Sequence, residues 1–209
     1  MGKRKTGGPS PQHEEGMGER MEFVLGTAAF AAFFAYDIDS VRPVRPWFHR
    51  LFAAGCALLA AATVWLVWSH RALMTLNAAS LLLAGGALAF AALMVYTLFF
   101  ALPFSATYLE ENAPRMAYTG GMYALCRHPG VLWFAGAYLC LGILLGTHRA
   151  VAFCLLVIGL NIAYILFQDA WTFPKTFVNY EEYRRTTPFL LPTPGSAARC
   201  VHTWKGGEG

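Results

Sequence analysis

Long uncharged stretches alternate with short polar segments along most of the chain. An α-helix rises about 1.5 Å per residue, so roughly 17 to 25 apolar residues are needed to cross a bilayer. The first and fourth stretches are short by this measure, and Glu22 lies within the first. The pattern predicts an all-α, polytopic membrane protein with about five transmembrane helices, at residues 21–36, 51–69, 78–104, 131–146 and 150–167.

The last two stretches are separated by only three polar residues, 147–149. So short a connection makes two apolar helices turn back on each other as an antiparallel hairpin. The two arms have nearly equal length, so the chain returns to the membrane surface that it left. Geometry therefore puts Arg127 and His128, which precede the hairpin, at the same end as Asp169, which follows it.

The composition agrees with a membrane location. Hydrophobic residues make up 56% of the chain and charged residues only 13%. The net charge of +4 does not indicate nucleic-acid binding, because the basic residues flank the apolar stretches instead of forming a patch on a soluble domain. The five cysteines include no Cys-x-x-Cys pair and no histidine has a partner at metal-ligand spacing, so we expect no metal site.

The basic residues also predict an orientation. With five spans, one side of the membrane carries 6 Lys and Arg residues, and the side with the open end of the hairpin and the C-terminus carries 10. The positive-inside rule makes the second side cytoplasmic. We therefore expect a multi-pass membrane protein whose C-terminus lies in the cytoplasm.

Two polar segments frame the apolar region. Residues 1–20 and 193–209 are rich in Gly and charge, which predicts flexible tails. Residues 21–104 hold the N-terminal transmembrane helices, and residues 105–192 hold the hairpin and a C-terminal amphipathic segment.

In the C-terminal amphipathic segment, Phe177, Tyr180 and Tyr183 recur at helical spacing between charged residues. This spacing predicts a short helix on the membrane interface whose aromatic face meets the membrane or a cofactor.

The polar residues around the hairpin follow an ordered series. Gly121-x-Tyr123 is followed by Arg127-His128-Pro129, an acid at the far end of the hairpin, Phe177-x-x-Tyr180-x-x-Tyr183 and a closing Pro192. This series resembles the isoprenylcysteine carboxyl methyltransferase and phospholipid methyltransferase group of integral membrane enzymes. The resemblance covers about residues 120–192, and the ordered series is more specific than Arg-His-Pro alone.

The resemblance implies S-adenosylmethionine-dependent methyl transfer to a lipophilic acceptor at the cytoplasmic membrane face. In that family the Arg-His-Pro segment and two glutamates after the hairpin help to bind the cofactor, while a lipid or other lipophilic substrate enters from the bilayer. Where the acceptor arrives protonated, His128 is the candidate general base. Carried over to this chain, the resemblance implies a cofactor site at Tyr123, Arg127, His128, Gln168, Asp169 and Tyr180.

The chain departs from the family pattern at two places, and other functions stay open. Val131 stands where the family usually has tyrosine, and Gln168-Asp169 stands where it usually has Glu-Glu. A sterol-reductase-like, NADPH-dependent membrane reductase also carries an Arg-His-Pro segment. A non-catalytic lipid-binding membrane protein keeps the hairpin without the cofactor. From spacing alone, Arg127 and Asp169 can also be a simple ion pair at the membrane boundary.

Overall fold

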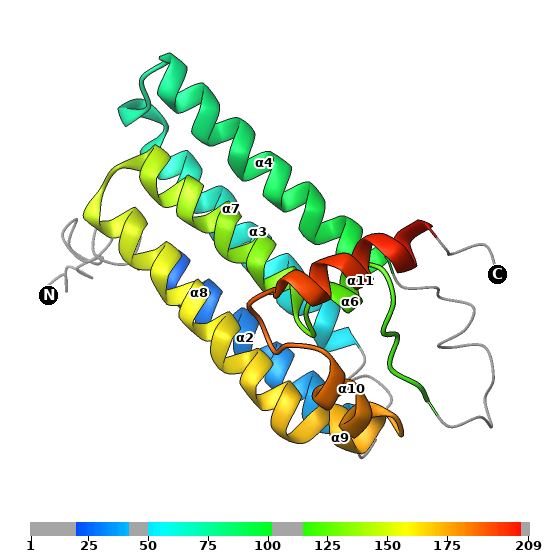
Figure 1. Cartoon of the computed structure of the whole chain (residues 1–209). Coiled ribbons are helices and arrows are strands. Elements are labelled where there is room, and N and C mark those ends of the chain that lie inside the picture. Colours follow the sequence, from blue (N-terminus) through cyan, green and yellow to red (C-terminus); the bar gives the residue numbers. More distant parts are fainter. Residues whose placement is uncertain (1–19, 42–49, 102–114, 206–209) are drawn as a thin grey trace, which may run out of the picture.

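The computed structural model describes residues 20–41, 50–101 and 115–205, which contain helices and turns but no strand. Four segments in this part of the chain are long and apolar enough to cross a membrane, and a fifth apolar helix has 17 residues. The predicted all-α, multi-pass membrane architecture is therefore confirmed. The body of the molecule consists of α2 (Met21–Val41), α3 (Arg50–His70), α4 (Ala78–Phe99), α7 (Pro129–Leu145) and α8 (His148–Phe167) (Figure 1).

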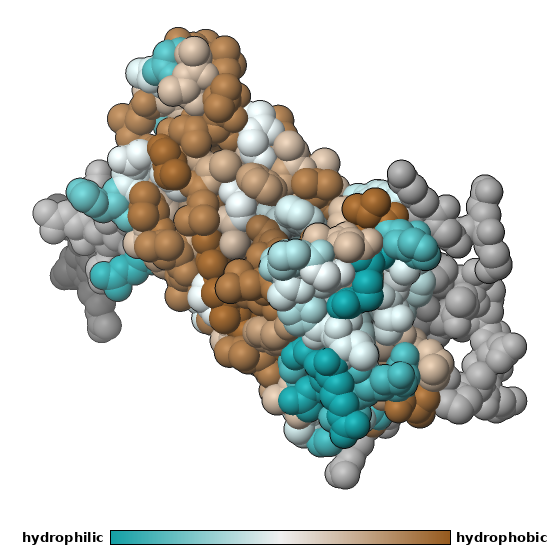
Figure 2. Space-filling view, in the orientation of Figure 1, coloured by the Kyte–Doolittle hydropathy of each residue, from teal (hydrophilic) through white to brown (hydrophobic). Residues whose placement is uncertain are grey.

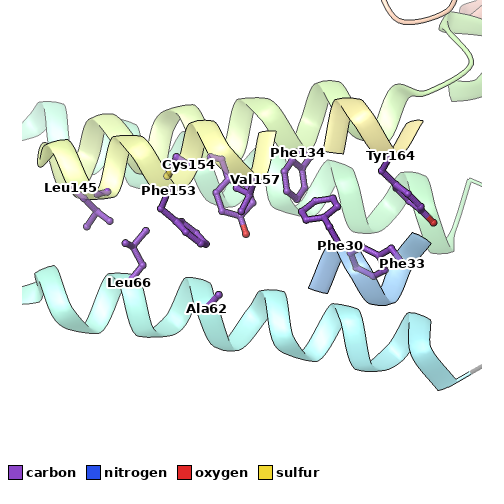
Figure 3. Close-up of a cluster of buried hydrophobic side chains, with 12 residues drawn as sticks. Phe30, Phe33, Ala62, Leu66, Phe134, Leu145, Phe153, Cys154, Val157 and Tyr164 are labelled. Carbon is purple, nitrogen blue, oxygen red and sulfur yellow. The ribbon is translucent and has the colours of Figure 1, made fainter. Parts of the chain in front are cut away.

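These long helices pack in an order that differs from their order in the chain. Helix α2 contacts α3 and α8, while α7 contacts α8 and α4. Aromatic side chains fill the space between them, as Figure 3 shows for Phe30, Phe33, Phe134 and Tyr164. Phe30 of α2 meets Phe134 of α7 edge-on, with 6.2 Å between the ring centroids. Such edge contacts join helices that are far apart in the sequence.

The hairpin of α7 and α8 is confirmed, and local sequence explains its turn. Gly146 ends α7 with φ 64°, a left-handed conformation that favours glycine. The hydroxyl of Thr147 then accepts from the N–H of Ala150 at 3.2 Å and caps the start of α8. Pro129 opens α7, where its fixed φ suits the first turn of a helix.

The outer faces of the long helices are apolar and exposed, as expected for surfaces that face lipid. Leu82 and Leu88 of α4 are 80% and 71% exposed. Figure 2 shows hydrophobic residues over much of the bundle and hydrophilic residues gathered towards the end where the short helices lie. This distribution agrees with a bundle whose polar chemistry sits at a membrane surface.

The short elements other than η1 lie at one end of the bundle (Figure 1). The 3-10 turn η1 (Arg71–Leu73) joins α3 to α4 at the opposite end. Helix α11 packs on α6, and the π-helical turn η2 continues α8 directly. The elements at the polar end are α6 (Met122–Leu125), η2 (Gln168–Thr172), α9 (Phe173–Thr176), α10 (Tyr180–Thr186) and α11 (Pro194–Lys205).

Three boundaries differ from those expected from the sequence. The first span continues past residue 36 to Val41, because Asp37 is buried inside the protein and does not mark a membrane boundary. The fourth begins at Pro129, since Pro129 and Gly130 form the first turn of α7. The third helix, α4, ends at Phe99, before the expected end at residue 104, which lies outside the described residues.

The prediction of a flexible tail at residues 193–209 is wrong for Pro194–Lys205, which form α11. Thr193 and Ser196 bond reciprocally at its start, with each backbone N–H donating to the other's hydroxyl. Thr203 anchors α11 on the body of the protein, because its hydroxyl accepts from the N–H of Gly121 at 2.9 Å. The tail at residues 1–20 lies almost wholly outside the described residues.

Two helix glycines offer a matched test of the packing. A Cβ on Gly55 of α3 would come within 2.5 Å of the Phe33 ring and 3.0 Å of the Ala29 carbonyl oxygen, whereas a Cβ on Gly85 of α4 would meet nothing within 4 Å. We expect Gly55→Ala to lower the free energy of unfolding by about 1 to 3 kcal/mol through overpacking. Gly85→Ala should leave stability unchanged or raise it slightly, because alanine favours a helix. Unfolding of both variants in detergent measures the difference, and equal effects would contradict the close packing of α2 on α3.

Candidate functional site

A short non-helical segment carries the first two candidate residues. Cys126 has extended backbone angles, and His128 is held out of the helical region because Pro129 follows it. Residues 126–128 therefore form a strap between α6 and α7. The backbone N–H of Arg127 is free to leave the helix and donates to the carbonyl of Pro188 at 2.9 Å.

Asp169 comes from the other arm of the hairpin. It lies in η2, the π-helical turn that follows α8, and only 7% of the residue is exposed. Single π-helical turns occur frequently at functional sites. The turn brings Asp169 against the strap, as the sequence predicts from the equal lengths of the two arms.

Arg127 and Asp169 form a bidentate ion pair. The Nε and Nη2 of Arg127 donate to the two carboxylate oxygens of Asp169, at 2.8 and 3.1 Å. Their side chains are only 9% and 10% exposed. Fork-to-fork pairing is the strongest geometry available to these two groups, and burial reduces its screening by water.

Arg127 also ties the C-terminal segment to the hairpin. Its Nη1 donates to the carbonyl oxygens of Arg184 at 3.0 Å and Thr187 at 2.9 Å. Four of the five guanidinium N–H groups of Arg127 are therefore engaged within the chain. The C-terminal segment therefore lies over the polar end of the hairpin, and this arginine holds it in place.

Two further side chains bond to Asp169. The hydroxyl of Tyr180 in α10 donates to its Oδ1 at 2.6 Å, and Nε2 of His128 lies 3.4 Å from the same oxygen. Burial and the bond to Asp169 both raise the pKa of Tyr180, so its hydroxyl stays protonated and donates. We call Arg127, His128, Asp169 and Tyr180 the Asp169 cluster.

His128 lies between aromatic rings. Its imidazole stacks on Phe173 at 5.7 Å between centroids and meets Phe189 edge-on at 5.2 Å. Burial lowers the pKa of His128, and the hydrogen bond to Asp169 opposes this shift. Because Nε2 faces a carboxylate, which only accepts, the neutral ring carries its proton on Nε2 and leaves Nδ1 basic.

The aromatic residues of the amphipathic segment face inward. Tyr180 and Tyr183 are 1% and 4% exposed, and the hydroxyl of Tyr183 donates to the backbone oxygen of Tyr123 at 2.7 Å. The two tyrosines therefore face the protein interior and not lipid, and contact of this face with a cofactor stays a prediction.

Two of the expected site residues lie elsewhere. The hydroxyl of Tyr123 points to α4 and donates to the carbonyl of Thr97 at 3.1 Å. The side chain of Gln168 faces Asp37 of α2. The physical reason is the turn geometry: Gln168 and Asp169 are neighbours on a helical turn, so their side chains point in different directions.

The structure also adds residues that the motif did not include. Arg184 brings its Nε to 3.7 Å from Asp169, and Phe189 covers both His128 and Arg127. Asp37 joins Gln168 and Thr172 beside the same π-helical turn. The sequence did not single out Asp37, because an acid directly after an apolar stretch normally marks the membrane boundary.

Comparisons with models of protein families, with curated proteins and with solved structures find no match. The assignment of a function therefore rests on the residues of the chain and their geometry.

Proposed function

We propose that this protein transfers a methyl group from S-adenosylmethionine to a lipophilic acceptor at the membrane surface where the hairpin opens. One observation carries the proposal. Four residues of the ordered series, Arg127, His128, the acid Asp169 and Tyr180, come from three separate segments and meet within hydrogen-bonding distance around Asp169. This convergence supports a shared binding site for these residues.

The donor set fits the charged part of the cofactor. The amino-acid end of S-adenosylmethionine carries a carboxylate and an ammonium group, which need a cation and an anion held close together. Arg127 is suited to the carboxylate, and Asp169 to the ammonium group. In the structure these two side chains pair with each other, so a cation and an anion are already held close together.

The aromatic residues and the membrane supply the other conditions. Bound there, the cofactor supplies an electrophilic methyl group on a sulfonium. The rings of Phe173 and Phe189 around His128 exclude water, and methyl transfer depends on positioning and on such exclusion. The Nδ1 of His128 is the basic atom for an acceptor that arrives protonated. The apolar outer surface of the bundle gives a lipophilic acceptor a route from the bilayer.

We place this end of the bundle on the cytoplasmic side, because 10 of the 16 Lys and Arg residues flank it. Reporter fusions to the C-terminus test the orientation. A reporter that is active only outside the cytoplasm would reverse it.

A second candidate function is that of a non-catalytic membrane protein. The observation in its favour is that the chain itself already satisfies the cluster. Asp169 accepts from Arg127, His128 and Tyr180, and the Nη1 of Arg127 donates to two backbone carbonyls. In a non-catalytic protein, the ion pair between Arg127 and Asp169 would serve only to hold the C-terminal segment over the hairpin.

Calorimetric titration of the detergent-purified protein with S-adenosylmethionine, and separately with NADPH, distinguishes these functions. We expect binding of S-adenosylmethionine, weakened about tenfold to a hundredfold in Arg127→Gln and Asp169→Asn, because each loses a charge-assisted hydrogen bond in a buried site. Asp169→Glu should retain binding or improve it. Glu181→Gln is the matched control, since Glu181 is 66% exposed and pairs only with Arg184 among the described residues.

Each alternative predicts another result. A non-catalytic protein that binds no cofactor gives no heat of binding with either ligand. Arg127→Gln and Asp169→Asn still lower its unfolding temperature. A membrane reductase binds NADPH in place of S-adenosylmethionine.

A further inference from the structure

Asp37 is a second buried carboxylate at the polar end of the bundle, and the proposed function does not use it. It lies near the C-terminal end of α2 and is 3% exposed. Ionisable side chains inside a membrane protein are rare, costly and usually functional. Glu22 is also buried in α2, but Arg149 neutralises it.

The described partners of Asp37 are neutral. The hydroxyl of Thr172 donates to Oδ2 at 3.4 Å, and the side chains of Gln168 and Tyr164 lie beside the carboxylate. No basic side chain in the described part of the chain forms an ion pair with it. Hydrogen bonds orient a buried carboxylate, but they do not balance its charge.

The position of Asp37 connects it with the Asp169 cluster. Gln168 and Thr172, two of its partners, belong to the same five-residue π-helical turn as Asp169. One face of this turn therefore meets Asp37, and another meets Arg127. Among the described residues, the two arginines that reach this turn, Arg127 and Arg184, both lie at Asp169, so no described cation balances the charge of Asp37.

We propose that Asp37 binds the positive charge of a small organic cation, and that this cation is the sulfonium group of S-adenosylmethionine. The inference rests on the proposed function and adds a residue to the cofactor site from outside the hairpin. A carboxylate only accepts hydrogen bonds and attracts positive charge, so an anionic or neutral group would gain little there. With Arg127 on the carboxylate and Asp169 on the ammonium, the three charges of the cofactor each meet an opposite charge.

The test compares two ligands that differ by this charge. S-adenosylhomocysteine has the same nucleoside and amino-acid parts as S-adenosylmethionine, but a neutral thioether in place of the sulfonium. We expect the wild-type protein to bind S-adenosylmethionine at least about tenfold more tightly by calorimetry. In Asp37→Asn this preference should disappear, while the affinity for S-adenosylhomocysteine changes less than about twofold. A ratio of two affinities does not move when a substitution only lowers stability.

Asp39→Asn is the matched control. It removes the same charge from the same helix two residues away, where the side chain points to a different face. This variant should keep the wild-type preference. Asp37→Ser replaces Asp37→Asn if the latter does not fold.

A second measurement separates this inference from the proposed function. Trimethylsulfonium chloride, compared with sodium chloride at equal ionic strength, should raise the unfolding temperature of the wild type but not of Asp37→Asn. If the wild type binds neither nucleoside but shows this difference, the proposed function is wrong and the cation site stands. An unchanged ligand preference in Asp37→Asn overturns the inference alone. No binding and no trimethylsulfonium effect overturn both.

Discussion

Asp169→Asn is expected to lower the free energy of unfolding by about 3 kcal/mol or more and to release the C-terminal segment from the hairpin. Breaking a buried ion pair by removing one partner typically costs about 3 to 5 kcal/mol, because the other charge is left buried without compensation. Here that charge is Arg127, whose side chain is 9% exposed. Asparagine keeps one acceptor oxygen, which places the expected loss at the lower end of this range.

Two measurements check the result. Unfolding in detergent gives the loss of stability, and limited digestion with trypsin reports the release of α10, where Arg184 and Arg185 are exposed but helical. Cleavage at these sites should become faster in Asp169→Asn, because the bonds from Asp169 to Tyr180 and Arg127 hold the segment in place. Glu181→Gln changes an exposed acid on the same helix and should leave both readouts near the wild type. A small stability loss with unchanged cleavage would contradict the role of Asp169 as the centre of the cluster.

The common position of Arg127, His128 and Asp169 could be predicted because it follows from local facts. Two apolar stretches of nearly equal length and a three-residue turn fix an antiparallel hairpin, whatever the rest of the chain does. The helical spacing of Tyr180 and Tyr183 predicted the short helix that lies over this end of the hairpin. These features depend on spacing along the sequence, so the sequence carries them.

The position of Asp37 could not be predicted in this way. An acid after an apolar stretch normally marks the membrane boundary, and only the packing of α2 against α8 and η2 shows that the helix continues and buries it. The π-helical turn was equally hidden, because one additional residue per turn leaves no pattern in five residues. Both features arise from tertiary packing. Together they place two buried carboxylates, those of Asp37 and Asp169, at the polar end of the bundle.

Helix α11 was missed for a related reason. Its composition resembles a loose tail, and its own residues bury little surface. Its position depends on distant partners: Thr203 accepts from Gly121, Arg199 donates to the carbonyl of Thr186 at 2.7 Å, and Trp204 stacks on Tyr96 of α4. Helices of this length are stabilised mostly by such packing and less by propensity.

The ion pair between Glu22 and Arg149 is expected to stabilise the opposite end of the bundle to a similar degree. Both N–H groups at one edge of the guanidinium of Arg149 reach the two carboxylate oxygens of Glu22, at 2.5 and 2.9 Å, and the Glu22 side chain has no exposed surface. The pair joins the first turn of α2 to the first turn of α8, where Phe23 also meets Phe153 edge-on. Glu22 further offsets the positive charge that Arg149 places at the N-terminal end of a helix, where a cation is unfavourable.

Glu22→Gln should therefore lower the free energy of unfolding by about 2 to 3 kcal/mol, less than a fully buried pair, because the side chain of Arg149 is 30% exposed and can turn towards water. Arg149→Lys should lose less, since lysine keeps the charge but not the fork. A double-mutant cycle with Glu22→Gln and Arg149→Gln isolates the pair itself and should give a coupling of about 1 kcal/mol or more. Because this pair lies at the other end of the bundle, Glu22→Gln should leave ligand affinity and tryptic cleavage at α10 unchanged. A coupling near zero would show that burial of Glu22, and not its bond to Arg149, determines the stability of this end.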